Sequence, residues 1–390
     1  MDSFQQGILT LIKCAITESP QHLPASFSLE AAEAFAAKQQ LVPLVYTGAL
    51  VCGIPAGEPL MQRMFQTYLK LTIHSERQMA AIHRLCRSFE ENQIDYLLLK
   101  GCIMKPLYPK PELRYMGDAD ILIRMEQYPK IIPLMEALGY ERKEETNHEL
   151  PWNSQALFVE LHKMLIPSYN KDYYAYFGDG WHFAKKAEGY RYVYSAEDDF
   201  IFQFSHFAKH YRNGGIGCRY VLDLWIFRRA NPQLDESYIR TELKKLHLLE
   251  FYENILRLIQ AWFEDGAMDE KLEFMTQVIF SGGSWGSWEK RILVQETHSA
   301  KVTGSRTGRT LKLLLRKILP PLSEMKWHYP LLEKQPWLLP VLWIVRLADI
   351  LLFKRHKIRK TQSILKEATD DKLRDYHKSL QYVGLDFHFD

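Results

Sequence analysis

A change in hydrophobic period near residue 93 constrains the fold of this chain more than any other feature. Residues 61–92 carry apolar side chains at helical spacing, without a glycine or proline. The next segment, 94–100, is a short apolar run bounded by Asn92 and Gly101, which is typical of a buried strand. Two more short runs, 118–124 and 156–162, also indicate strands. Because helical patterns lie on both sides, we expect an α+β protein with a small mixed-sheet core.

Three regions are predicted along the chain: a helical region over 1–90, an α/β core over 91–195 and a helical domain over 196–390. Within the core, one or two helical turns are expected over 101–108. A helix over 126–138 should be closed by Gly139. The last region has helical patterns at 200–211, 220–230 and 238–263, with glycine-rich loops expected at 282–287 and 303–308.

The five cysteines are scattered and form no CxxC pair, which excludes a disulfide framework and a thiolate zinc site. The first residues, MDSFQQGILTLIKC, lack a basic segment ahead of an apolar run, so no secretory signal is predicted. Both features favour a reducing compartment, and we expect a cytoplasmic protein.

Charge is distributed unevenly along the chain. Residues 301–390 hold 18 Lys and Arg against 9 Asp and Glu, whereas the whole chain has a net charge of only +3. Five of the seven residues from Lys354 to Lys360 are Lys or Arg. Such a segment suits weak contact with an anionic membrane surface or with nucleic acid, but a solvated basic helix edge gives the same pattern.

The most apolar stretch, Trp337 to Phe353, precedes that basic run and contains Pro340, Arg346 and Asp349. Its 17 residues fall short of the roughly 20 that a spanning helix needs, so no integral membrane span is expected. A packed helix with a solvated basic edge is the first interpretation, and an interfacial amphipathic helix is the second.

Asp118 and Asp120 are two residues apart on a predicted strand, so their carboxylates project from the same face. Ala119 and Ile121 would then point into the core behind them. Adjacent carboxylates repel each other, and proteins keep such pairs near a cation or a shared proton. Paired oxygen ligands of this kind suit Mg²⁺ together with phosphate oxygens.

These aspartates lie inside a longer pattern. Its residues are Leu97 to Gly101, Leu107 to Pro109 and Arg114 to Ile123. The pattern resembles the signature of an uncharacterised nucleotidyltransferase family within the polymerase-β superfamily. The segments Ser205 to His210, Gly214 to Gly217 and Arg219 to Leu224 resemble the helical part that follows in this family. The resemblance covers roughly residues 40–350, and only its first part has sharp motifs.

The resemblance implies a polymerase-β-type α/β core and a role for particular residues. The glycine that ends the first strand corresponds to Gly101, the acidic pair to Asp118 and Asp120, and the third acid to Glu160. Two features depart from the superfamily pattern. Lys100-Gly101-Cys102 replaces the usual Gly-Gly or Gly-Ser doublet, a form for which the resemblance to the uncharacterised family accounts, and the third acid is a glutamate 40 residues beyond Asp120.

In such a site, Asp120 bridges two Mg²⁺ (or Mn²⁺) ions, Asp118 holds the nucleotide's ion, and Glu160 completes the other shell and helps to deprotonate the acceptor. Gly101 allows the backbone to approach a triphosphate. Lys100 and Arg114 would neutralise phosphate, or alternatively pair with carboxylates.

The remaining candidates have weaker signals. His206 and His210 are four residues apart, which permits metal binding, but no third ligand is evident and hydrogen-bonded or acceptor-contacting histidines are favoured. Arg219 lies four residues before Asp223, and a helical ion pair is the default interpretation. His162 would share a strand face with Glu160 and orient it or contact substrate.

The predicted function is therefore transfer of a nucleoside monophosphate from an NTP to a hydroxyl or phosphate acceptor with two-Mg catalysis. The acceptor stays open between a small molecule, a peptide or protein, and RNA. The alternative is a non-catalytic nucleotide-binding or interaction module that retains the fold, such as a toxin–antitoxin component.

Overall fold

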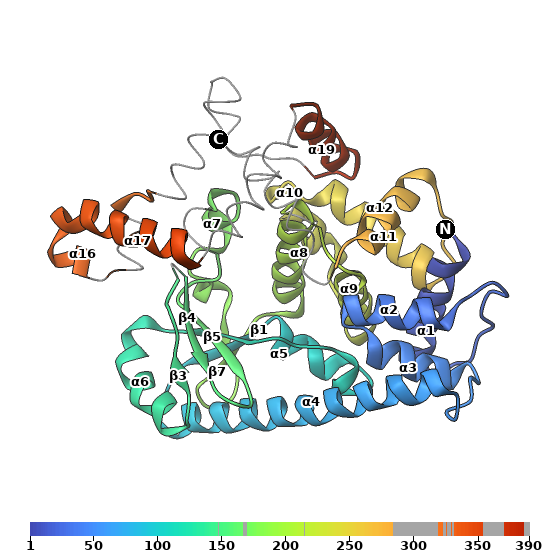
Figure 1. Ribbon diagram of the computed structural model, residues 1–390, viewed down its shortest axis with the longest axis horizontal. Coiled ribbons are helices and arrows are strands. Elements are labelled where there is room, and N and C mark those ends of the chain that lie inside the picture. The colour runs from blue at the N-terminus through green and yellow to red at the C-terminus, as the bar shows by residue number, and fades with distance from the viewer. Residues whose placement is uncertain are drawn as a thin grey trace.

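A computed structural model describes residues 1–146, 148–166, 170–213, 215–283, 319–322, 325, 329, 331–353 and 370–385. A mixed sheet lies toward one end of the molecule and a helical assembly toward the other (Figure 1). The 33-residue helix α4, Pro59–Glu91, runs alongside both (Figure 1). The expected α+β class, with a mixed-sheet core inside a mostly helical chain, is confirmed.

The sheet has seven strands in the order β3-β4-β5-β2-β1-β7-β6. Strand β2 pairs antiparallel with β1 and parallel with β5, and β1 pairs parallel with β7. The strands are β1 (Tyr96–Leu99), β2 (Ala119–Ile123), β3 (Glu141–Arg142), β4 (Glu149–Asn153), β5 (Phe158–His162), β6 (Lys185–Lys186) and β7 (Arg191–Val193). The three predicted strands are β1, β2 and β5.

The two faces of the central strands differ in chemistry. Ala119, Ile121 and Ile123 of β2 belong to one hydrophobic cluster, together with buried residues of α4 and of α6 (Tyr128–Ala137). Residues of β2 and β5 alternate between faces, so Asp120 and Glu160 project from the opposite face. The prediction that Ala119 and Ile121 lie in the core behind the aspartates is confirmed.

The helices at the two ends of the chain share one hydrophobic cluster. The N-terminal amine lies 3.0 Å from Glu273, and Gln39 donates a hydrogen bond to the Gly282 carbonyl at 2.7 Å. The division into three regions remains a prediction. The helices of this assembly are α1 (Ser3–Thr17), α2 (Leu29–Gln39), α3 (Val42–Val51), α8 (Ala196–Arg212), α9 (Cys218–Ala230), α10 (Glu236–Lys245), α11 (Leu249–Phe263), α12 (Glu270–Ser281) and α19 (Asp370–Tyr382).

Short elements connect the strands. They are α5 (Gly101–Met104), α7 (Lys171–Phe177) and the 3-10 turns η1 (Lys105–Leu107), η2 (Pro111–Leu113), η3 (Met125–Gln127) and η4 (Trp181–Phe183). The predicted turns over 101–108 are thus α5 and η1. Gly139 follows α6 with φ +80°, as expected of a glycine that closes a helix.

The prediction of one helix over 238–263 is wrong, because the structure has two, α10 and α11. Between them His247 adopts φ 55°, and the Leu248 amide donates back to the Leu243 carbonyl at 2.8 Å. This is a left-handed helix end formed without glycine, so the sequence gives no sign of it. The helices over 200–211 and 220–230 are confirmed as α8 and α9, whereas residues 284–287 and 303–308 of the expected loops lie outside the described residues.

The apolar C-terminal stretch forms η5 (Pro336–Leu338) and α17 (Leu339–Phe353), with α16 (Leu331–Lys334) before them. The prediction of a packed helix is wrong for one face of this stretch, where Trp337 is 71% and Ile344 67% exposed. Among the described residues, no helix combines the length and the apolar character needed to cross a bilayer. The basic run 354–360 lies outside the described residues.

Candidate functional site

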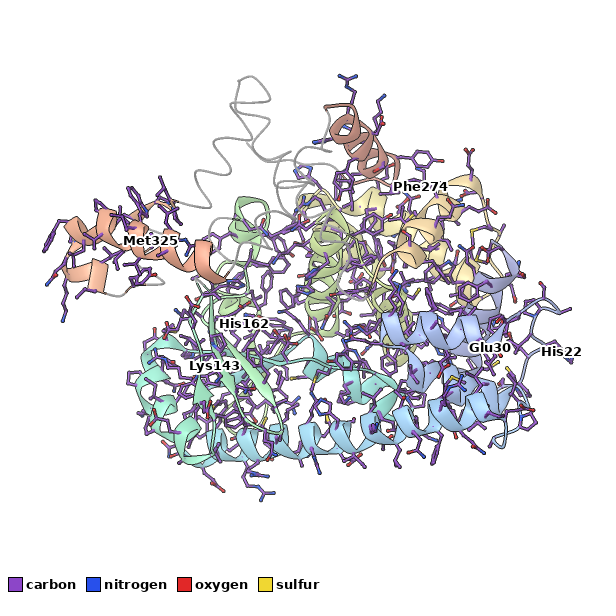
Figure 2. All side chains as sticks on the ribbon, in the orientation of Figure 1. His22, Glu30, Lys143, His162, Phe274 and Met325 are labelled. Carbon is purple, nitrogen blue, oxygen red and sulfur yellow. The ribbon has the colours of Figure 1, made fainter. Side chains whose placement is uncertain are left out.

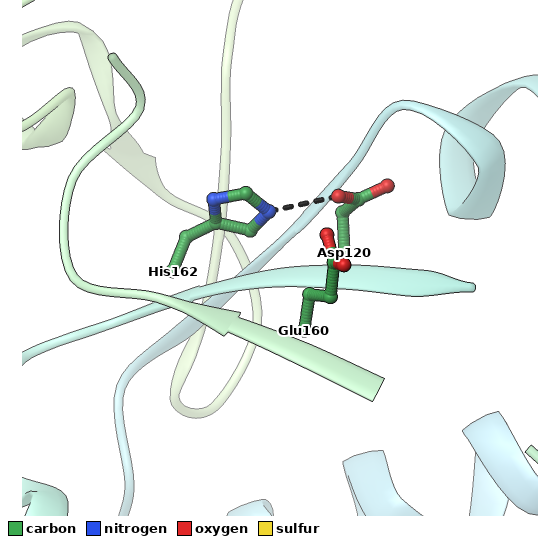
Figure 3. Close-up of side chains that lie close together, drawn as sticks. All are labelled: Asp120, Glu160 and His162. Atoms are coloured by element: carbon green, nitrogen blue, oxygen red, sulfur yellow. Dashed lines mark hydrogen bonds and ion pairs between the residues drawn. The ribbon is translucent and has the colours of Figure 1, made fainter. Parts of the chain in front are cut away.

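The two neighbouring strands β2 and β5 place acidic side chains next to each other. Asp120 is directly opposite Glu160 in the parallel register, and Leu122 is opposite His162. Ligand atoms of Asp120, Glu160 and His162 all lie within 4.8 Å of one another (Figure 3). His162 is buried in the interior of the molecule (Figure 2). Asp118, immediately before β2, lines the same cavity.

Asp120 is the most tightly held of these groups. Its Oδ1 atom accepts a hydrogen bond from Lys100 Nζ at 2.7 Å and lies 2.8 Å from His162 Nε2. Burial acts to raise the pKa of Asp120, but the Lys100 ammonium and the hydrogen bond from His162 outweigh it, so this pKa lies well below its usual value. Asp120 is therefore a carboxylate at neutral pH.

The pKa values of Glu160 and Asp118 are shifted upward, in the direction opposite to that of Asp120. Burial and the neighbouring carboxylates, Asp120 first among them, raise the pKa of Glu160 to about 8. Burial and Asp120 likewise raise the pKa of Asp118 to about 6, although Lys100 opposes the shift. Like charges that crowd in this way are relieved by a proton or by a bound cation. Oxygen ligands fit Mg²⁺ or Mn²⁺, so the donor set fits the predicted ions.

His162 is a neutral neighbour of the acidic group. Burial, followed by the nearby Lys100, lowers its pKa, although Asp120 opposes this. A neutral imidazole whose Nε2 donates to Asp120 leaves Nδ1 as an acceptor, and Nδ1 has no hydrogen-bond partner within the described part of the chain. The structure thus brings His162 to Asp120 as well as to the strand face of Glu160.

Lys100 adopts an unusual backbone conformation at the start of α5, with φ 46° and ψ −111°. This region favours glycine, so a lysine here stores strain. The Lys100 side chain reaches the Asp120 carboxylate and remains 18% exposed.

The protein's own packing favours a glycine at position 101. A Cβ atom at this position would lie 2.9 Å from Met116 Cγ and 3.2 Å from Arg114 Nη1. The loop that leads to Asp118 therefore packs directly on the glycine. This packing is a reason for Gly101 in addition to the predicted approach of a triphosphate.

Arg114 joins this loop to helix α9. Its Nε and Nη2 atoms donate to the two carboxylate oxygens of Asp223 at 2.9 and 3.0 Å, and Tyr108 donates to Asp223 at 2.7 Å. The pairing with a carboxylate, given above as the alternative to phosphate binding, is thus present. The default partner of Asp223 was Arg219, whose Nη1 instead donates to the Tyr115 carbonyl at 3.2 Å.

One cavity of about 300 Å³ lies between the sheet and the helices α8 and α9. All ten residues that the sequence analysis selected line it. From the sheet side these are Lys100, Gly101, Arg114, Asp118, Asp120, Glu160 and His162, and from α8 and α9 they are His206, His210 and Arg219. A cavity of this size is at the lower end of the range for small-molecule sites.

Within the described part of the chain, His206 and His210 belong to no group of three or more possible metal ligands. The group found there is the one at Asp120. The centroids of their two imidazole rings are 4.4 Å apart. Burial, followed by His210, keeps the pKa of His206 well below its usual value, so it is uncharged at neutral pH.

Sequence reasoning missed Lys209 on the same wall, between the two histidines. Its side chain has no hydrogen-bond or ion-pair partner among the described residues. Burial and the nearby Lys100 lower its pKa to about 8. The available sequence signal was its position three residues after His206, because residues three apart lie on one face of a helix. Glu149, a nearby alternative to Glu160 as the third acid, also lines the cavity, and its strand β4 was not predicted because Pro151 argues against a strand.

Comparison with known proteins indicates a function that agrees with the geometry of the site. A family model described as uncharacterised nucleotidyltransferase matches residues 26–264, which is more than half of the chain. The chain belongs to this family. No curated protein and no solved structure matches the chain. The part matched by the nucleotidyltransferase family contains every strand of the sheet, α8, α9 and all the cavity-lining residues named above.

Proposed function

We propose that this nucleotidyltransferase transfers a nucleoside monophosphate from an NTP to a hydroxyl or phosphate acceptor, with Mg²⁺ or Mn²⁺ as the cofactor. The observation that carries the proposal is the register of β2 and β5, which sets Asp120 beside Glu160 on the cavity face of the sheet. Membership of the nucleotidyltransferase family supports the same reaction class.

Asp118, Asp120 and Glu160 would hold the cation. When bound, the cation neutralises phosphate charge and stabilises the attacking and leaving oxygens. His162 and Lys100 both bind Oδ1 of Asp120, so they fix the orientation of this carboxylate. A bound cation would offset the repulsion from Asp120 that raises the pKa of Glu160, so Glu160 would ionise and its carboxylate would accept a proton from an acceptor hydroxyl.

The cationic wall of the cavity would bind the triphosphate. Lys209 is the best candidate because it is partly buried and its ammonium group has no partner among the described residues. Arg219 of α9 and Lys100 line the same cavity. Arg114 is engaged by both oxygens of Asp223, so its role in this proposal is to position the loop before Asp118.

A cytoplasmic location is part of the proposal. All five cysteines are free thiols, which is ordinary in a reducing compartment. NTP is also abundant there. The acceptor is left as a small molecule, a peptide or protein, or RNA.

The test uses NTPs labelled at either the α- or the γ-phosphate, incubated with the purified protein, Mg²⁺ and a cell extract. Transfer of a nucleoside monophosphate predicts that the α-label becomes attached to an acceptor while the γ-label leaves as pyrophosphate. The Asp118→Asn/Asp120→Asn variant should give neither product. Glu91→Gln/Glu126→Gln, which removes two exposed charges outside the cavity, is the matched control and should behave as the wild type.

Two results would reject the proposal. Attachment of the γ-label rather than the α-label would indicate phosphoryl transfer. Binding of NTP without transfer of either label, in every extract and with every NTP, would favour the non-catalytic nucleotide-binding module.

A further inference from the structure

The outward face of the C-terminal apolar segment carries a continuous stripe of exposed apolar side chains. Trp337, Val341, Ile344 and Val345 are 71%, 52%, 67% and 49% exposed. The full stripe consists of Trp337, Pro340, Val341, Ile344, Val345 and Ala348, all of them exposed. These positions recur at intervals of three and four, so they lie on one side of η5 and α17. We call them the α17 stripe.

The opposite face of α17 is attached to the protein. Trp343 donates a hydrogen bond from its indole nitrogen to the Pro320 carbonyl at 2.9 Å, and Leu338, Leu342 and Leu347 are half-buried. The helix is therefore held by one face while the stripe faces away. In Figure 1, α16 and α17 lie at the edge of the molecule, on the side of the sheet away from α1, α2 and α3.

An exposed apolar face of this length requires a partner, since water does not solvate it favourably. The sequence around it is cationic: residues 301–390 hold 18 Lys and Arg against 9 Asp and Glu. Within residues 331–353, Lys334 and Arg346 balance Glu333 and Asp349, so the positive excess comes from the flanking sequence, including five Lys and Arg in 354–360. Apolar side chains next to excess positive charge are complementary to an anionic bilayer surface, whose acyl layer accepts the former and whose headgroups attract the latter.

We propose that the α17 stripe docks on the surface of an anionic lipid bilayer, with the helix lying in the plane of the interface. Trp337 would sit at the headgroup level, where tryptophan is favoured. The helix lies on the bilayer rather than crossing it, in agreement with the absence of a spanning helix among the described residues. RNA would be attracted by the same charge but would leave the apolar stripe uncovered.

A second exposed apolar row on α4 provides a comparison. Phe65, Leu69 and Ile73 are 41%, 41% and 46% exposed. The neighbouring exposed positions are polar, with Gln66 and Lys70 next to them. This row is narrower and less exposed than the α17 stripe, so it is not expected to enter a bilayer.

The experiment is flotation of the full chain with phosphatidylcholine vesicles that contain or lack phosphatidylglycerol. The wild type should float only with the anionic vesicles, and added salt should weaken the association. Trp337→Ser/Ile344→Ser should lower the partition coefficient at least about tenfold, because it removes the most exposed apolar groups. Leu69→Ser/Ile73→Ser is the matched control and should float as the wild type does.

Three results would overturn the proposal. The first is a wild type that does not float with anionic vesicles, and the second is an equal loss of vesicle binding in the α4 control. The third is RNA binding that the stripe variant retains in full, with no binding to vesicles.

Sedimentation velocity distinguishes a further case. A wild-type dimer that the stripe variant converts to monomer would make the stripe an interface between two copies. Binding of NTP by the stripe variant, measured in parallel, keeps this outcome separate from that of the proposed catalytic site.

Discussion

At the scale of single residues, Asp120 and Glu160 show how the same surroundings shift two carboxyl groups in opposite directions. Lys100 and His162 both hydrogen-bond to one carboxylate oxygen of Asp120, so its negative charge is stabilised. For Glu160, burial and the negative charge of Asp120 dominate, so its own ionisation is opposed. One firmly ionised acid beside one that retains a proton is a common arrangement in catalytic sites.

Stability of the metal-free protein should fall as pH rises from about 4.5 to about 8. Folding raises the pKa of Glu160 from 4.5 to about 8, so the unfolded chain releases this proton first and the folded state loses stability across that window. Thermal unfolding in a chelator should give a midpoint that decreases by several degrees. Glu160→Gln should flatten the slope, and Glu126→Gln, at an exposed site, should not; equal slopes in all three proteins would refute the assignment.

Glu160→Gln should leave NTP binding nearly unchanged and reduce turnover by about 100-fold or more, because shape is kept while the proton acceptor is lost. Titration calorimetry and the label-transfer assay measure the two quantities separately. Near-normal turnover would mean that another carboxylate has this role, and Glu149, which lines the same cavity, would be tested next.

At this scale, the sequence predicts features that depend on neighbouring residues and not those that depend on distant contacts. Alternation along a strand places Asp120 and Ala119 on opposite faces, and the structure agrees. The partner of Arg114 is Asp223, 109 residues away, and no local pattern indicates such a contact. The left-handed backbone of Lys100 is equally hidden, because it depends on packing around α5.

At the scale of elements, α8 and α9 supply the cationic wall that faces the acidic strands. Lys209→Met should weaken NTP binding by about tenfold, since a buried phosphate contact is lost, and should leave Mn²⁺ binding in the absence of nucleotide unchanged. Lys163→Met is the control: Lys163 is similarly buried, pairs with Glu145 at 3.2 Å and lies outside the cavity. Equal effects of the two substitutions on NTP binding, measured by titration calorimetry, would remove Lys209 from the site.

The ion pair between Arg114 and Asp223 attaches α9 to the loop that leads into β2. Asp223→Asn should lower the free energy of unfolding by about 3 kcal/mol, because a buried guanidinium loses its charged partner. Asp95→Asn, which breaks the more exposed pair with Arg124, should cost about 1 kcal/mol or less. Urea denaturation measures both. A small loss for Asp223→Asn would show that the pair contributes little to holding the loop.

Elements with a strong local pattern were predictable and short ones were not. Strands β1, β2 and β5 are apolar runs with clear ends, whereas β3 and β6 have two residues each and carry no period. The break between α10 and α11 depends on His247 and not on a glycine. For α17, the helix was predicted, but its exposed face was not, because apolar composition alone does not reveal what covers it.

At the scale of the whole molecule, the helical segments at the two ends of the sequence close over the same core. Phe35 of α2 stacks on Phe280 of α12 with ring centroids 5.1 Å apart, although the two are far apart in the chain. Sequence periodicity predicts that both segments are helical and amphipathic. Periodicity does not predict that these two helices pack together, since many helices of one chain have apolar faces of similar composition.

The central claim is that the cavity binds NTP through a divalent cation held by Asp118, Asp120 and Glu160. Thermal unfolding with NTP and Mg²⁺, separately and together, tests it most directly. Binding to the folded state alone should raise the wild-type midpoint by a few degrees, and only when both are present. Asp118→Asn/Asp120→Asn should remain folded without this increase, whereas Glu91→Gln/Glu126→Gln should retain it. An increase that is the same in all three proteins, or that does not require the metal, would contradict the claim.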